Sequence, residues 1–310
     1  MYDSVNLWYP AKYGFNQKEI NTIGQCLTTS DSYTNSFGQL IINGHLKNYK
    51  VRISEKGVSC KGSLAKYFLS DNFQTLNKSD SKRALEKLSD ELHISMFLAE
   101  LKRVDFAQNY IMNHPPETYY NSLGDSQHYQ RLIQPKSLYY SNTKRTKLFY
   151  NKIAEGKSKG ELLPAIWKGK NILRYELRFL NRLSKQFAKS ELIASKLFDD
   201  RFYISIFDRW YNEYKEITKL NKFNFNTKNM NSPKDFWKQL ELLAIHTIGK
   251  DKIMDEIENL RRQNAFDKPE YYSRIKKDVK AILSSSKHTE QDELITELDK
   301  KIKASKTHYR

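Results

Sequence analysis

The sequence predicts an α+β protein in which an antiparallel-sheet domain precedes an α-helical C-terminal region. Short segments that alternate apolar and polar side chains recur through the first 180 residues, with turn residues between them. From about residue 190 the apolar residues recur at helical spacing instead. With 310 residues, of which 39% are hydrophobic and 13% aromatic, the chain can bury a sizeable core. We therefore expect a sheet domain over residues 1–189 and a helical region over residues 190–310.

The first hundred residues combine strand and helix patterns. An alternating strand is expected around residues 4–9, followed by a helix over residues 16–27. Turns at Gly44 and Gly57 then separate short β-rich pieces, which predicts an antiparallel meander over residues 39–43, 49–54 and 58–60. Apolar residues three and four apart predict an amphipathic helix over residues 79–92.

Strand patterns continue to about residue 180. Residues 95–106 are apolar enough for a long core strand, and the Pro115–Pro116 pair begins a short helix or loop. Further strands are expected at residues 137–141, 146–153 and 171–180. In the last of these, Arg174, Glu176 and Arg178 alternate with apolar residues, so one face is polar and the other belongs to the core.

The remaining third of the sequence is helical in pattern. Its apolar residues predict helices over residues 199–220, 232–248, 252–264 and 269–285. The Asn-rich segment 220–231 is expected to be a linker, and the hydrophilic tail after Ser284 is expected to fray.

Positive charge is concentrated in one part of the chain. The formal net charge is +17, and residues 131–189, here called the basic segment, contain 15 Lys or Arg but only three acids. Aromatic residues lie among these cations, as binding to phosphates and stacked bases requires. A merely soluble surface usually mixes both signs of charge, so we favour a nucleic-acid partner. No P-loop glycine pattern is present, which argues against an ATPase motor.

The sequence also indicates a compartment. Its apolar stretches are too short for a membrane span, and no secretory signal is recognisable. The only cysteines are Cys26 and Cys60. We expect a protein of the reducing cytoplasm, in a bacterial host, with no membrane partner.

Three acids are candidate metal ligands. Asp105, Glu155 and Glu176 each lie at or near a predicted strand with basic neighbours. Clustered carboxylates repel one another unless a cation neutralises them, so we expect a Mg²⁺ or Mn²⁺ site. The alternative is that each acid pairs with a nearby cation, which here means Arg103, Lys152, Arg174 or Arg178. A contribution from His114 or His128 is left open.

Tyr150 is a candidate nucleophile. Tyr150 and Lys152 are two residues apart in a predicted strand, so both would lie on its polar face. A tyrosine hydroxyl needs help to ionise, which a metal ion or the Lys152 ammonium group could give. The chain contains 20 tyrosines, and Tyr139 and Tyr140 are the nearest alternatives.

Five segments, taken in order, resemble the gene-II-like replication initiators of filamentous phages and related plasmids. They are MYDSVNLWYP at the start, GSLAKYFLSDN from Gly62, RVDFAQNY from Arg103, LYYSNTKRTKLFYNKIAE from Leu138 and LRYELRF from Leu173. The last three are also similar to the nicking-site segments of staphylococcal-type plasmid initiators. The two-histidine metal motif of many rolling-circle enzymes is missing, which agrees with a carboxylate site.

The resemblance implies an activity. It implies an initiator of rolling-circle replication that nicks one origin strand through Tyr150, leaves a covalent phosphotyrosine and a free 3′ hydroxyl, and later rejoins the strand. It also implies metal carboxylates at Asp105, Glu155 and Glu176, and a single-stranded or hairpin form of origin DNA as partner. A host helicase and a second copy of the chain are further possible partners. Basic residues in or beside the five segments are candidate DNA contacts, namely Lys66, Arg103, Lys144, Arg145, Lys147, Arg174 and Arg178.

Two other functions fit the same residues. A relaxase would use the same chemistry to start conjugative transfer. A non-catalytic DNA- or RNA-binding regulator would use the acids only as ion-pair partners. The sequence leaves open which origin is recognised and whether the element is a phage, a plasmid or a transposon.

Overall fold

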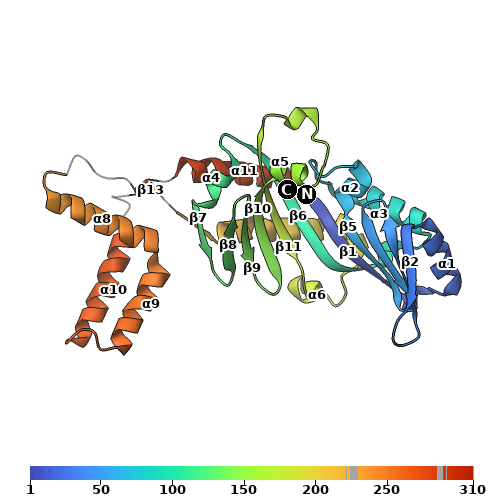
Figure 1. The fold of residues 1–310 in the computed structure, drawn as a ribbon, viewed down its shortest axis with the longest axis horizontal. Helices are drawn as coiled ribbons and strands as arrows, with labels where there is room; N and C mark the ends of the chain where they lie inside the picture. The colour runs from blue at the N-terminus through green and yellow to red at the C-terminus, as the bar shows by residue number, and fades with distance from the viewer. Residues whose placement is uncertain (221, 224–229, 285–288, 291, 310) are drawn as a thin grey trace. The chain divides into compact units, whose positions relative to one another are not determined.

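The computed structural model describes residues 1–220, 222–223, 230–284, 289–290 and 292–309. The chain forms two compact units, one of Met1–Thr218 with Glu297–Arg310 and the other of Lys219–Thr296 (Figure 1). The first unit holds the sheet and the second is mainly helical. The α+β class is therefore confirmed, while the functional division that we expect at residue 189 stays a prediction.

A ten-stranded antiparallel sheet forms the body of the first unit. Its strand order is β2-β3-β4-β5-β1-β6-β11-β10-β9-β8, so the longest strand, β6, lies near the middle and β8 lies at an edge. The strands are β1 (Tyr2–Pro10), β2 (Thr28–Thr34), β3 (Leu40–Leu46), β4 (Tyr49–Ser54), β5 (Gly57–Ser63), β6 (Glu100–Met112), β8 (Gln130–Gln134), β9 (Ser137–Ser141), β10 (Arg145–Asn151) and β11 (Asn171–Phe179). The predicted meander is β3, β4 and β5, which pair in sequence order.

Helix α7 (Asp200–Lys215) covers one face of the central strands. The Tyr175 ring of β11 stacks on Phe149 of β10 at 4.6 Å between centroids and lies 4.9 Å from the Trp210 ring of α7. The Tyr175 hydroxyl also donates to the Trp210 carbonyl oxygen. This aromatic core leaves the opposite face of β6, β11 and β10 available for polar side chains.

Smaller elements complete the first unit. Its helices are α1 (Gln17–Cys26), α2 (Leu64–Leu69), α3 (Lys78–Leu92), α4 (Pro116–Tyr120), α5 (Lys152–Ser158) and α6 (Leu183–Gln186), with 3₁₀ turns at Ala11–Tyr13, Met96–Leu98, Ala165–Trp167 and Ala194–Phe198. The short strands β7 (Leu123–Ser126) and β12 (Ile217–Lys219) pair with each other.

Two expected strands had wrong boundaries. The strand expected at 95–106 begins only at Glu100, after a 3₁₀ turn, and continues to Met112. The strand expected to reach residue 153 ends at Asn151, whose side chain accepts a hydrogen bond from the Ala154 amide and caps α5. Lys152 therefore begins a helix rather than ending a strand.

The C-terminal tail does not fray as expected. Helix α11 (Glu293–Tyr309) buries Leu298 and Ile302 completely. Its Ser305 hydroxyl lies 2.9 Å from the Tyr110 hydroxyl of β6, and Glu297 accepts a hydrogen bond of 3.0 Å from the Asn113 amide. The buried apolar residues of α11 are spaced three and four apart, so they form one narrow apolar face. This face packs against the protein although the rest of the helix is polar.

The second unit contains α8 (Pro233–Ile248), α9 (Lys250–Arg262) and α10 (Pro269–Ser284), close to three of the predicted helices. Strand β13 (Lys222–Phe223) pairs with β14 (Thr289–Glu290), and most of the predicted 220–231 linker lies outside the described residues. No helix of the described residues is both long and apolar enough to cross a membrane.

Candidate functional site

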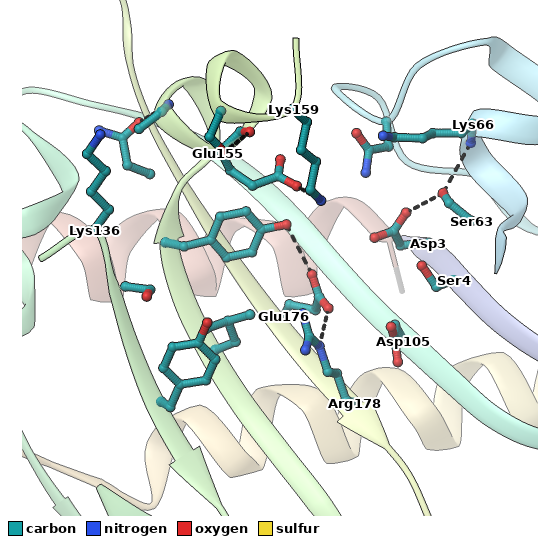
Figure 2. A pocket seen from close by; sticks show the side chains of 18 of the residues that line it. Asp3, Ser4, Ser63, Lys66, Asp105, Lys136, Glu155, Lys159, Glu176 and Arg178 are labelled. Atoms are coloured by element: carbon teal, nitrogen blue, oxygen red, sulfur yellow. Dashed lines mark hydrogen bonds and ion pairs between the residues drawn. The ribbon is translucent and has the colours of Figure 1, made fainter. Parts of the chain in front are cut away.

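A cavity of about 600 Å³ lies on the sheet face opposite α7 (Figure 2). Side chains of β1, β6, β9, β10, β11 and α5 line it, together with Ser63 and Lys66 at the start of α2. We call it the basic cavity because its charged lining consists of five cations and four carboxylates: Lys66, Arg103, Lys136, Lys159 and Arg178 with Asp3, Asp105, Glu155 and Glu176.

Strand alternation and register bring the predicted residues together. On β11, Arg174, Glu176 and Arg178 share the face away from α7, and Arg178 is directly opposite Asp105 on β6. Glu176 is opposite Leu148 on β10, two residues before Tyr150. Strand pairing therefore brings together residues of β6, β10 and β11 that are far apart in the sequence.

Tyr150 lies in the basic cavity with its hydroxyl held. The side chain is only 8% exposed, and its hydroxyl donates to Glu176 Oε2 at 3.2 Å. Burial raises the pKa of Tyr150 well above its ordinary value; the Arg174 charge opposes this shift and the Glu176 charge adds to it. The phenol is thus protonated in this state and needs a base to become a nucleophile.

The two alternative tyrosines are separated by the sheet. Tyr139 lines the same cavity as Tyr150. Tyr140, the next residue of β9, lies on the opposite face and donates to the Gly124 carbonyl oxygen at 2.7 Å. Of the three tyrosines, only Tyr139 and Tyr150 are in the cavity.

Asp105 is a buried carboxyl group beside a second one. Arg103 donates two hydrogen bonds to it, at 2.7 and 2.6 Å, and the side chain is 1% exposed. Burial raises the pKa of Asp105 to about 7; the Arg103 hydrogen bond opposes the rise and the nearby Glu176 charge adds to it. The two carboxyl groups therefore repel each other, and a cation between them would relieve that repulsion.

Glu155 is held by two lysines, Lys152 at the start of α5 and Lys159 directly after its end. Its Oε2 atom lies 2.7 Å from the Lys152 Nζ atom, and Lys159 contacts its other oxygen. Burial favours the protonated form, but Lys152 and Lys159 together keep the pKa of Glu155 below its ordinary value. The buried Lys152 ammonium group also contacts Asn72 Oδ1 at 2.6 Å. Glu161 Oε2 lies 4.0 Å from the same ammonium group, and Lys152 does not line the cavity with Tyr150.

The residues present fit a divalent cation in part. Asp105 and Glu176 offer hard oxygen donors and repel each other, which suits Mg²⁺ or Mn²⁺. Within the described ranges, however, no three His, Cys, Asp or Glu side chains come together as a metal site. Figure 2 shows Glu155 on α5 beside Lys159, apart from Asp105 on β6. Neither His114 nor His128 lines the cavity. The three-carboxylate site stays a prediction.

The seven predicted DNA contacts lie in three places. Lys66, Arg103 and Arg178 line the basic cavity. Lys144 and Arg145 line a different hollow, beside α7. Arg174 and Lys147 are completely buried instead of facing solvent.

Each of these two buried cations forms an ion pair with a buried carboxylate. Arg174 Nη2 lies 2.6 Å from Asp3 Oδ2, beneath the cavity. Lys147 alternates with Leu148 and so lies on the α7 side, 2.8 Å from Glu213 Oε2. Burial lowers the pKa of Lys147, and Glu213 opposes that shift. Asp3 and Glu213 hold these two charges inside the protein, which sequence position alone did not indicate.

Several lining residues were not predicted, namely Asp3, Ser63, Asn72, Lys136 and Lys159. Asp3 accepts a hydrogen bond of 2.8 Å from Ser63 as well as its ion pair with Arg174. Burial disfavours its charge, but Arg174 and Ser63 hold the pKa of Asp3 below its ordinary value. An acid inside a mainly apolar first strand was the signal that could have identified Asp3.

Comparison with known proteins identifies the family. Residues 1–213 match the family model for the N-terminal region of the phage replication-associated protein, the product of gene II. The chain belongs to this family. The resemblance to filamentous phage gene II proteins is thereby confirmed, and the family implies a role in rolling-circle replication with origin DNA as partner. The match covers the sheet and most of α7, and the unit Lys219–Thr296 lies outside it. A search of curated proteins found no match.

Proposed function

We propose that this replication protein nicks one strand at a replication origin by attack of Tyr150 on a backbone phosphate, and later rejoins the strand. The observation that carries the proposal is the Tyr150 hydroxyl in the basic cavity, 3.2 Å from Glu176 Oε2. A carboxylate at hydrogen-bond distance is the base that a phenol with a raised pKa requires.

The reaction is a transesterification. Glu176 accepts the phenol proton while the Tyr150 oxygen forms a bond to the scissile phosphorus. The bond between phosphorus and the 3′ oxygen breaks, and that oxygen takes up a proton from solvent. The products are a 5′-phosphotyrosine and a free 3′ hydroxyl, so the energy of the phosphodiester bond is kept. Rejoining is the reverse reaction, with Glu176 returning the proton to Tyr150.

The cations of the cavity hold the phosphate. Arg103 and Arg178 come from β6 and β11, and Lys66, Lys136 and Lys159 are the other cations of the lining. These groups neutralise charge on the phosphate oxygens as it grows in the transition state. Asp105 and Glu176 are the residues that would hold a Mg²⁺ or Mn²⁺ ion, which supplies further stabilisation of that charge when bound.

The proposal is tested by covalent adduct formation on a supercoiled plasmid that carries the element's own origin, with Mg²⁺ or Mn²⁺ present. The wild-type protein should become linked to DNA, and Tyr150→Phe should form no adduct although it still binds the plasmid. Tyr140→Phe is the matched control, because Tyr140 faces away from the cavity, and it should form adducts as the wild type does. Adduct formation by Tyr150→Phe would show that the nucleophile is another residue.

The same assay separates the alternatives. If the wild-type protein binds the origin but never forms an adduct, the chain is a binding regulator and the proposal fails. If adducts form on a transfer origin but not on a replication origin, the relaxase function is correct instead.

A further inference from the structure

A further hollow lies at the edge of the sheet next to the basic cavity. It has a volume of about 190 Å³, and side chains of β8 and β9 line it. We call it the edge hollow, and its lining residues are Gln130, Leu132, Gln134, Tyr139 and Ser141. All five follow the two-residue alternation of their strands, so they share one face.

Strand register connects the edge hollow to Glu176. Glu176 on β11 is opposite Leu148 on β10, Leu148 is opposite Tyr139 on β9, and Tyr139 is opposite Leu132 on β8. Leu148 and Tyr139 line the basic cavity, and Tyr139 lines the edge hollow as well. An unbroken apolar row thus runs from the carboxylate that holds Tyr150 to the edge strand.

The chemistry of the edge hollow suits a flat heterocycle with polar edges. The Tyr139 ring and the Leu132 side chain, which is 53% exposed, offer apolar surface. On either side of Leu132 the amide groups of Gln130 and Gln134 offer donors and acceptors. The side-chain oxygen Oε1 of Gln134 accepts a hydrogen bond of 3.2 Å from the Ser137 hydroxyl, which orients that amide group.

We propose that the edge hollow binds one unpaired nucleobase of the DNA strand whose phosphate occupies the basic cavity. The proposal rests on the proposed function for the position of that phosphate. Because Tyr139 lines both hollows, the edge hollow is continuous with the basic cavity and its cations. This continuity favours a nucleic acid over a protein partner. The base stacks on Tyr139 and Leu132 while the glutamines contact its edge, so the site selects an unstacked strand over a duplex.

The test compares binding of two single-stranded oligonucleotides of equal length, one of thymidine and one with abasic sugars, to the full chain without divalent metal. Wild-type protein should bind the thymidine strand about tenfold more tightly, as one stacked base would give. Leu132→Ala and Tyr139→Ala should lose most of this preference and keep their affinity for the abasic strand. Tyr139→Phe keeps the ring and should keep the preference.

Ile133→Ala is the matched control. Ile133 is the next residue of the same edge strand, is 41% exposed and is not among the residues of the edge hollow. Its preference for bases should equal that of the wild type. Leu132 is a surface residue, so its variant keeps the test valid if Tyr139→Ala unfolds.

Two outcomes would overturn the inference. One is an unchanged preference in Leu132→Ala and Tyr139→Ala. The other is a fall in oligomeric state in these variants by light scattering, which would make the edge a contact between copies of the chain. Failure of the proposed function is recognised separately, because wild-type protein would then form no adduct with origin DNA whatever its preference for bases.

Discussion

At the scale of single residues, the basic cavity is an arrangement of charges that restrain one another. Glu176 accepts hydrogen bonds from Tyr150 and from Arg178, the latter at 2.6 Å. Asp105 is held by Arg103 and raised in pKa by burial and by Glu176. Glu176 accepts the Tyr150 hydrogen bond, so it is placed to take up the phenol proton. Glu176 and Asp105 also repel each other, so the pair is suited to bind a cation.

Glu176→Gln tests the role of this carboxylate. The amide keeps the shape but cannot accept the phenol proton, so adduct formation should fall at least about a hundredfold. Binding to single-stranded DNA, measured by anisotropy, should change by less than about threefold, since the cavity loses a negative charge and no cation. Adduct formation at the wild-type rate would remove Glu176 from the mechanism.

Asp3→Asn tests the buried ion pair beneath the cavity. The change removes the nearer carboxylate partner of the buried Arg174 charge, at 2.6 Å, and leaves Glu176 at 3.4 Å. The free energy of unfolding should therefore fall by about 3 kcal/mol in urea titrations at neutral pH. The exposed pair Lys12–Glu191 is the control, and Lys12→Ala should cost less than about 1 kcal/mol. Equal costs for the two variants would contradict a structural role of Asp3.

The pH dependence of this pair has a definite sign. Because the pKa of Asp3 is below its ordinary value in the folded state, the folded protein binds fewer protons there than the unfolded chain. The contribution of Asp3 is present above its ordinary pKa and is lost as the pH falls through the folded value. The difference in stability between wild type and Asp3→Asn should therefore shrink in acid.

At the scale of elements, pairing between strands decides which predictions were correct. Two-residue alternation was visible in β11, and it correctly placed Glu176 and Arg178 on the polar face. The same alternation places Lys147 on the α7 side, where Glu213 holds it from 66 residues away. Lys147 was predicted as a DNA contact because its neighbours in the sequence are basic. Its partner Glu213 lies on α7, which packs against this face of the sheet only in the folded chain.

Helix α11 shows the same limit. Its apolar residues were present in the sequence, but the polar composition around them concealed a docking face, and Tyr110 and Asn113 of the sheet region are its partners. Local periodicity predicts that these residues form a helix, but the packing of the helix depends on the surface that it contacts in the folded protein. The strand boundary at Asn151 was missed because its capping bond depends on the turn into α5.

Truncation of Leu298 tests the docking of α11. Leu298 is fully buried, so Leu298→Ala should lower the free energy of unfolding by about 2–5 kcal/mol. Lys303 lies on the same helix and is exposed, and Lys303→Ala should stay within about 0.5 kcal/mol of the wild type. Equal stability of the two variants would mean that α11 contributes nothing to the sheet unit.

At the scale of the whole molecule, the net charge of +17 acts through a few places. Five cations line the basic cavity, while Arg174 and Lys147 are neutralised inside the protein. The match to the replication family ends at residue 213, so the family relationship concerns the sheet unit and not the helical unit Lys219–Thr296.

Salt dependence measures how many of these cations meet phosphate. Lys136 is exposed and lines the cavity, so Lys136→Ala should reduce the slope of log affinity against log salt for single-stranded DNA by about 0.7. Lys12 is paired with Glu191 and is not among the cavity residues, so Lys12→Ala should leave the slope unchanged. Equal slopes for wild type and Lys136→Ala would mean that phosphates do not enter the cavity.

In the proposed reaction, Tyr150 is the residue that becomes covalently linked to the cut strand. The most direct measurement is tandem mass spectrometry of the protein–DNA adduct after digestion with nuclease and protease. We expect a residual nucleotide on the peptide that contains Tyr150, attached to the tyrosine oxygen. A nucleotide on Tyr139 or on any other residue would contradict it.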